Sequence, residues 1–210
     1  MSKIIFKEGF EDQNKQAGMK EKRKAILSLC KTFPTGHRRV GEPTLFEKNL
    51  ADGVKIHTVR SNEGNAWAKR CQDVMQGRKY LSVRQWTGRP YNSKQEEIAR
   101  FDKIGLQKIT MTYSSEDAVP QCWVDGHRVP VETVAANDGL STEDFVNWFF
   151  GRNPKNIFEG VVIQFTDFRY CWKGHVWYIG NYSNGAICGW SLLLFRILRI
   201  INRKLRNALN

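Results

Sequence analysis

The amino-acid sequence predicts an α+β fold: a small β-barrel with short flanking helices and a C-terminal amphipathic helix. Several short segments are rich in β-branched and aromatic residues and are bounded by Gly, Pro, Asn and Ser, which is typical of strands. Two capping-box patterns indicate short helices. The repeated alternation of strand and long helix that builds a parallel sheet is absent, and 210 residues are enough for one domain with an appended segment.

The chain begins with a polar arm, a strand and a helix. Residues 8–24 are polar and have no clear apolar period, so we expect a loose or helical arm over residues 1–24 before the domain. Ala25 to Phe33 is a short apolar run followed by proline and glycine, as in a buried strand and its exit. Thr44 and Glu47 form a capping box that opens a short helix, and Asp52-Gly53 ends it.

The rest of the domain is predicted to consist mostly of strands. Asp125-Gly126 is a two-residue hairpin signal, because a type I′ turn needs positive φ at both central residues. Ser141 and Asp144 form a second capping box, which opens a helix through Phe150. The domain is expected to span residues 25–170, with a C-terminal extension over 171–210. The predicted strands are Lys55 to Arg60, Tyr80 to Thr87, Leu106 to Tyr113, Gln121 to Val124, His127 to Val131 and Phe158 to Thr166.

The formal net charge of +12 predicts a polyanionic partner, of which nucleic acid is the usual one. The charge is unevenly placed: residues 1–110 carry about +11, residues 111–170 about −5 and residues 171–210 about +6. Two basic regions therefore flank an acidic one. A uniformly cationic packaging protein would not show this division.

Cysteine usage predicts a reducing, cytoplasmic environment. Five widely spaced cysteines contain no C-x-x-C pair and no zinc-ligand spacing with histidine, so neither a disulfide framework nor a metal site is expected, and no cofactor is implied. Charges interrupt each short apolar run near the N-terminus, so no signal peptide is expected. The most apolar stretch, Gly185 to Phe195, is about 11 residues, against about 20 needed to span a bilayer.

The segment Gly53-Val-Lys55-Ile-His-Thr58-Val-Arg60 carries the clearest functional pattern, G-x-K-x-x-T-x-R. It resembles the signature of the ASCH domain family of the PUA-like superfamily, in which the threonine position is usually an acid. The version of the motif with threonine is similar to that of small bacterial amidohydrolases that deacetylate N4-acetylcytidine. The wider sequence, including Leu81 to Tyr91 and Gly160 to Asp167, resembles uncharacterised ASCH-like proteins of gut bacteria and their bacteriophages, which implies host cytoplasm if the protein is phage-encoded.

The resemblance implies a site formed by three side chains. In the similar enzymes the lysine and threonine work with a distant glutamate just before a short helix, and the acid in that context here is Asp138. The expected roles are Thr58 as nucleophile, Lys55 as general base and Asp138 as the group that orients Lys55 or contacts substrate. Arg60 would support the pocket wall or bind a ribose or phosphate oxygen. Aspartate is one methylene shorter than glutamate, and catalytic geometry does not tolerate a misplacement of about 1 Å.

Outside this motif, an aromatic and basic segment predicts a nucleic-acid or substrate contact. Trp86 and Tyr91 alternate with Arg84 and Arg89 in a region that contains glycine and proline. Rings can stack on bases while cations neutralise phosphates. An ordinary packed turn is the alternative. His57, inside the octapeptide, is interpreted as a structural hydrogen-bonding residue.

Residues 191–210 predict a basic amphipathic helix. The segment contains five cations and no acid, and its apolar residues recur at helical spacing: Leu194, Ile197, Leu198, Ile201 and Leu205. This helix could dock on the domain, bind a protein partner, bind nucleic acid or lie on an anionic membrane surface.

Three functions from different classes fit the sequence. The first is an ASCH-type module that binds RNA or a modified nucleoside in a cleft lined by Lys55, Thr58, Arg60 and Asp138, and hydrolyses an N4-acylcytidine amide. The second is a non-catalytic RNA or nucleic-acid binding module. The third is a phage accessory or structural protein that uses the fold for protein contacts.

Overall fold

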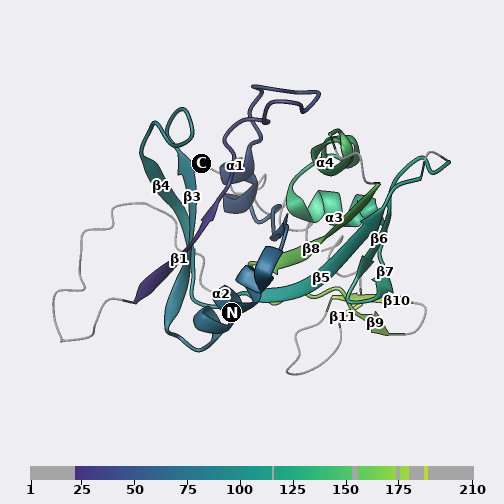
Figure 1. Ribbon diagram of the computed structural model, residues 1–210. Helices are drawn as coiled ribbons and strands as arrows, with labels where there is room; N and C mark the ends of the chain where they lie inside the picture. The colour runs from purple at the N-terminus through teal and green to yellow at the C-terminus, as the bar shows by residue number, and fades with distance from the viewer. Residues whose placement is uncertain (1–21, 115, 153–155, 174–175, 180–186, 189–210) are drawn as a thin grey trace, which may run out of the picture. The chain divides into compact units, whose positions relative to one another are not determined.

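A computed structural model describes residues 22–114, 116–152, 156–173, 176–179 and 187–188 of the chain. It divides into two compact units, residues 1–167 and 168–210, which are described separately. The first unit contains two sheets and several short helices (Figure 1), so the predicted α+β class is confirmed.

The larger sheet of the first unit has five antiparallel strands in the order β2-β8-β5-β6-β7. Its turn between β6 and β7 is the predicted one, since Asp125 and Gly126 have φ values of 47° and 78°. β2 lies at one edge, paired only with β8 within this sheet. The strands are β2 (His57–Arg60), β5 (Gly105–Thr112), β6 (Gln121–Val124), β7 (His127–Arg128) and β8 (Ile157–Gln164).

The smaller sheet has the order β1-β3-β4, from strands β1 (Arg23–Ser28), β3 (Lys79–Trp86) and β4 (Gln95–Phe101). β1 and β3 are parallel, and β3 and β4 form an antiparallel hairpin. A parallel pair needs a long crossover, and here the chain between β1 and β3 contains two helices and β2. β4 was not predicted from the sequence.

The described residues contain four α-helices and a 3₁₀ turn, against two predicted helices. Ser141 caps α4 as predicted, because its hydroxyl accepts from the Asp144 N–H at 3.1 Å. Thr44 does not cap α1: its hydroxyl donates to the Cys30 carbonyl at 2.7 Å, and Leu45 occupies the cap position. The helices are α1 (Phe46–Ala51), η2 (Glu63–Asn65), α2 (Ala66–Met75), α3 (Val131–Asp138) and α4 (Thr142–Phe150).

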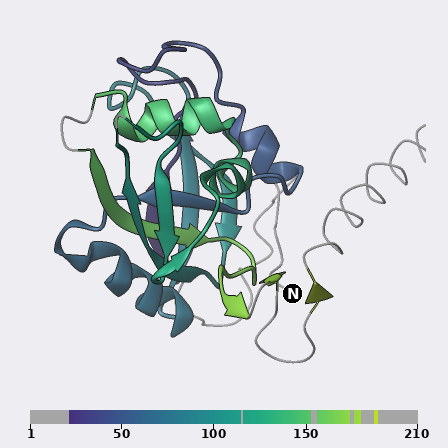
Figure 2. The ribbon, with the colours of Figure 1, turned by 90° about the vertical axis from the view of Figure 1, so that its right-hand side faces the viewer.

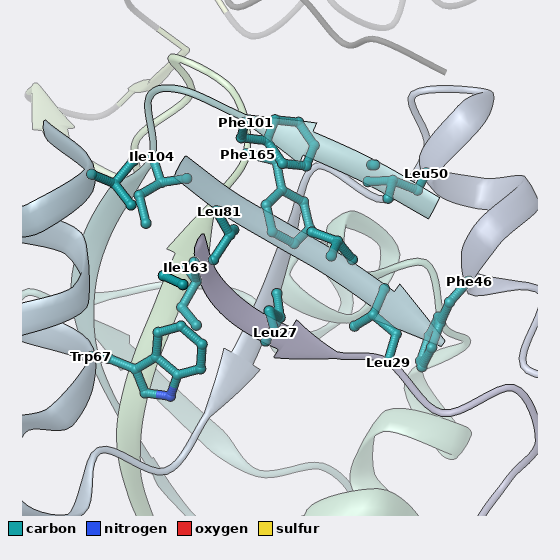
Figure 3. Close-up of a cluster of buried hydrophobic side chains, with 14 of the residues drawn as sticks. Leu27, Leu29, Phe46, Leu50, Trp67, Leu81, Phe101, Ile104, Ile163 and Phe165 are labelled. Atoms are coloured by element: carbon teal, nitrogen blue, oxygen red, sulfur yellow. The ribbon is translucent and has the colours of Figure 1, made fainter. Parts of the chain in front are cut away.

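The apolar core of this unit draws on both sheets (Figure 3). Leu27 of β1 and Ile163 of β8 belong to one buried cluster, and Phe101 of β4 stacks on Phe165 just after β8, with ring centroids 4.9 Å apart. Burial of each such side chain contributes about 1.5–3 kcal/mol to folding. Figures 1 and 2 show α3 and α4 together beside the five-stranded sheet.

The second unit contains a small antiparallel sheet in the order β11-β10-β9. Its strands are β9 (Trp172–Lys173), β10 (Val176–Ile179) and β11 (Ile187–Cys188). The helix predicted over 191–210 and most of the arm predicted over 1–24 lie outside the described residues. Within the part of the chain that is described, no helix has the length and apolar character needed to cross a membrane.

Candidate functional site

Asp138 lies beside β2, the strand at one edge of the five-stranded sheet. It is the last residue of α3, which Gly139 ends with a φ of 79°. The Asn137 carbonyl accepts from the Ile56 N–H at 2.9 Å, and Oδ2 of Asp138 accepts from the Val59 N–H at 3.2 Å. The end of α3 thus accepts hydrogen bonds from one backbone donor just before β2 and one within it, and this fixes the carboxylate beside the octapeptide.

Lys55 lies in the loop before β2, so the twofold alternation of a strand does not separate it from Thr58. Its Nζ donates to the Asp138 carbonyl at 2.7 Å and forms an ion pair with Oδ1 of the same residue. The ammonium also lies over the Phe46 ring, 4.1 Å from its centroid. The Lys55 backbone N–H donates to the Asn49 carbonyl at the end of α1, which holds the loop in place.

Thr58 and Arg60 share one face of β2. Their cross-strand partners, Ile163 and Val161, belong to the core cluster, so this face points toward the core between the sheets. The Arg60 guanidinium donates to Thr58 Oγ1 at 2.8 Å and to the Val59 carbonyl at 2.7 Å. Among the described residues no hydrogen bond joins the Thr58 hydroxyl to Lys55 or Asp138.

The structure therefore brings the predicted residues together as two bonded pairs, Lys55 with Asp138 and Thr58 with Arg60. Lys55, Thr58 and Asp138 are all buried, and Arg60 alone of the four is partly exposed. The NH2 group of Arg60 donates to the carbonyl of exposed Ser28 at 3.1 Å. Arg60 is therefore the member of the site that lies nearest to solvent.

Burial dominates the electrostatics of this site. It lowers the pKa of Lys55 to about 8, against the opposing effect of Asp138, and Arg60 lowers it further. Burial also lowers the pKa of His57 to about 4, so this imidazole is neutral at pH 7. A lysine with a pKa of about 8 holds a proton at pH 7 but can lose it at modest cost, as a general base requires.

The predicted aromatic and basic segment occupies the end of β3 and the β3–β4 turn. The Trp86 and Tyr91 rings lie 5.2 Å apart, centroid to centroid. Tyr91 is 89% exposed and has a φ of 66°, which is unfavourable for a bulky residue. Arg84 is half-buried and donates to the Gln95 carbonyl at 2.9 Å, while Arg89 is exposed.

Ser28, at the end of β1, connects the two predicted regions. Its hydroxyl accepts from Gln95 Nε2 at 2.9 Å, and Gln95 pairs with Trp86 across the hairpin. Its carbonyl accepts from Arg60, which in turn donates to Thr58. Neither Ser28 nor Phe46 was identified from the sequence, because a lone serine or phenylalanine in an apolar run carries no local signal of a tertiary contact.

Within the described ranges no group of three or more His, Cys, Asp or Glu side chains could hold a metal ion. Comparisons with protein-family models, with curated proteins and with solved structures find no match for this chain. The case for a function therefore rests on the residues and their geometry.

Proposed function

We propose that this chain is an ASCH-type module of the PUA-like superfamily, its two sheets forming the small barrel of that fold, and that it binds RNA or a modified nucleoside beside Lys55, Thr58, Arg60 and Asp138. We further propose that it hydrolyses the amide of an N4-acylcytidine. The observation that carries the proposal is the convergence of Lys55 and Asp138 beside Thr58, from segments 83 residues apart.

The proposed reaction uses the Thr58 hydroxyl as nucleophile. Neutral Lys55 Nζ takes the hydroxyl proton as Oγ1 bonds to the acyl carbon, and returns it to the exocyclic nitrogen as the C–N bond breaks. Water then hydrolyses the Thr58 ester, which releases the carboxylate and restores the hydroxyl. The hydrogen bond from Arg60 to Oγ1 supports this role, because a cationic donor favours the alkoxide form.

The shorter acid is compatible with this proposal. Asp138 reaches both the Lys55 ammonium and the Val59 N–H with its two carboxylate oxygens, and α3 brings the backbone close enough for a short side chain to suffice. Its role in the reaction is to hold Lys55 in place. Substrate would approach from the side of Arg60, the partly exposed residue of the four.

A non-catalytic binding module is the second candidate. It is favoured by the burial of Lys55, Thr58 and Asp138, since a buried lysine and aspartate in an ion pair are also a purely structural arrangement. In that case Arg60 and the β3–β4 turn would contact RNA, and the Lys55–Asp138 pair would support them.

Incubation of the purified full chain with N4-acetylcytidine tests the proposal. We expect cytidine release that increases as the pH rises through about 8, because the neutral form of Lys55 is required. Thr58→Val, which keeps the side-chain shape, and Lys55→Ala should both abolish release, whereas Lys48→Ala on the exposed face of α1 should not. Absence of release from the folded chain, or undiminished release by Thr58→Val, would overturn hydrolysis. Salt-dependent RNA affinity without release would favour the binding module.

A further inference from the structure

The β3–β4 turn presents an aromatic pair to solvent at an energetic cost. Tyr91 is 89% exposed and lies in the left-handed backbone region, yet its ring remains 5.2 Å from the Trp86 ring. A tyrosine at positive φ is unfavourable relative to glycine or to an extended residue. The turn is held by its own hydrogen bonds, including Gly88 N–H to Ser93 Oγ at 3.0 Å and Thr87 N–H to the Lys94 carbonyl at 2.9 Å.

Cations surround this aromatic pair without carboxylate partners. Arg84, Arg89 and Lys94 form no ion pair with any described residue, and Arg89 and Lys94 are exposed. Glu97, the cross-strand partner of Arg84, accepts instead from Ser82 and Arg100. The turn therefore combines an exposed ring with cations that form no ion pair among the described residues.

Hydrogen bonds through Ser28 also connect the β3–β4 hairpin to the site beside Thr58. Gln95, opposite Trp86 in the hairpin, donates to the Ser28 hydroxyl, and the Ser28 carbonyl accepts from Arg60. Figure 1 shows the β3–β4 hairpin alongside β1, the strand that Ser28 ends. Ser28 therefore joins the β3–β4 hairpin to Arg60 through two hydrogen bonds.

We propose that the β3–β4 turn is a stacking platform for single-stranded RNA, with Tyr91 and Trp86 contacting bases and Arg84, Arg89 and Lys94 contacting phosphates. The inference rests on the proposed function and names its substrate class: a nucleotide within a single-stranded RNA, presented to Arg60, instead of a free nucleoside. Unpaired bases are required because the faces of bases within a duplex are stacked on their neighbours and unavailable to a ring.

Fluorescence anisotropy with labelled RNA tests the platform on the full chain. A single strand of about 12 nucleotides should bind more tightly than a duplex of the same sequence, and its affinity should fall with salt. Tyr91→Gly removes the ring and relieves the positive φ, so the fold is retained while affinity falls about fivefold or more. Tyr91→Phe should keep most of the affinity.

Arg89→Gln and Lys69→Gln form a matched pair of charge variants. Both residues are exposed cations without an ion pair among the described residues, but Lys69 lies on α2. Arg89→Gln should reduce the slope of log affinity against log salt by about 1, and Lys69→Gln should leave it unchanged. Equal affinity for the duplex, or unchanged affinity in Tyr91→Gly, overturns the platform. Cytidine release from free nucleoside with no RNA binding rejects the platform alone, and RNA binding without release rejects hydrolysis alone.

Discussion

Lys55 and Asp138 form an ion pair in which the lysine side chain is 0% exposed and the aspartate side chain 5% exposed. Two charges removed from water in this way are stable only as a pair, because each alone would retain the cost of desolvation. The Asp138 carbonyl and the Val59 N–H complete the hydrogen bonding of the pair. The pair thus joins the end of α3 to the loop before β2.

Removal of either partner should destabilise the protein by about 3–5 kcal/mol, since it leaves an uncompensated buried charge. Lys55→Met and Asp138→Leu should each show this loss in urea unfolding. The double variant should lose much less than the sum, because both desolvation costs disappear together. Additive losses in the double variant would show that the two charges are not coupled in the folded chain.

His57 should make the protein less stable in acid. Its pKa is about 4 in the folded chain, against 6.5 for an unperturbed histidine, so the unfolded chain binds more protons between these values. The free energy of unfolding should therefore fall by about 3 kcal/mol from this group as the pH drops from 6.5 to 4.

Carboxylates titrate in the same range, so the test compares the parent with His57→Gln. The difference in unfolding free energy between the two chains, measured by urea titration at several pH values, should change across this window and stay constant above pH 7. A constant difference throughout would contradict the assignment of the acid dependence to His57.

Sequence patterns predicted elements whose signal is local and missed those whose stability depends on contacts. Asp125-Gly126 and the Ser141 cap were predicted correctly because each encodes its own backbone geometry. α2 was missed because its N-cap, Asn65, is followed three residues later by Ala68, so no capping box marks its start. α3 was missed because Pro130 and Val131 were interpreted as the end of a strand, whereas burial of Val134 and Ala135 stabilises a helix.

The sequence likewise indicated some residues of the candidate site but not the contacts between them. The octapeptide and the acidic turn identified Lys55 and Asp138, which the structure joins. Thr58 and Arg60 are two residues apart on β2, so their shared face follows from strand alternation. The contact of Arg60 with Ser28 depends on how β1 approaches β2, and no spacing in the sequence encodes that approach. Burial of the site was likewise not evident, because Lys, Thr and Asp are residue types usually found on the surface.

Arg60→Lys should reduce stability although it keeps the charge. The guanidinium contacts three oxygens, on Thr58, Val59 and Ser28, and a single ammonium cannot reproduce that fork. We expect a loss of about 1–2 kcal/mol in the free energy of unfolding. Ser28→Ala is the control, because it keeps the carbonyl that Arg60 uses and removes only the hydroxyl. An Arg60→Lys chain as stable as the parent would show that these bonds contribute little.

Asp144 ties a basic loop to the start of α4. Its carboxylate, 4% exposed, accepts from Arg38 at 3.0 Å and from Arg39 at 2.8 Å, although both arginines are partly exposed. The His37 ring lies 3.0 Å from the Asp144 carbonyl, and Arg38 N–H donates to Asn147 Oδ1 at 2.8 Å. Within the described ranges, the buried Asp144 carboxylate is thus the one acid that pairs with both arginines of the loop.

Asp144→Asn should release this loop and make it sensitive to trypsin, which must take an arginine side chain into its own acidic pocket. Arg38 and Arg39 are engaged in the parent, so cleavage requires local opening, and loss of the carboxylate makes opening more frequent. We expect cleavage after these residues several-fold faster under native conditions, with a loss of about 1–3 kcal/mol in unfolding free energy. Glu143→Gln removes only the exposed pair with Arg38 and should leave both quantities nearly unchanged. Equal cleavage rates in Asp144→Asn and the parent would mean that other contacts hold the loop.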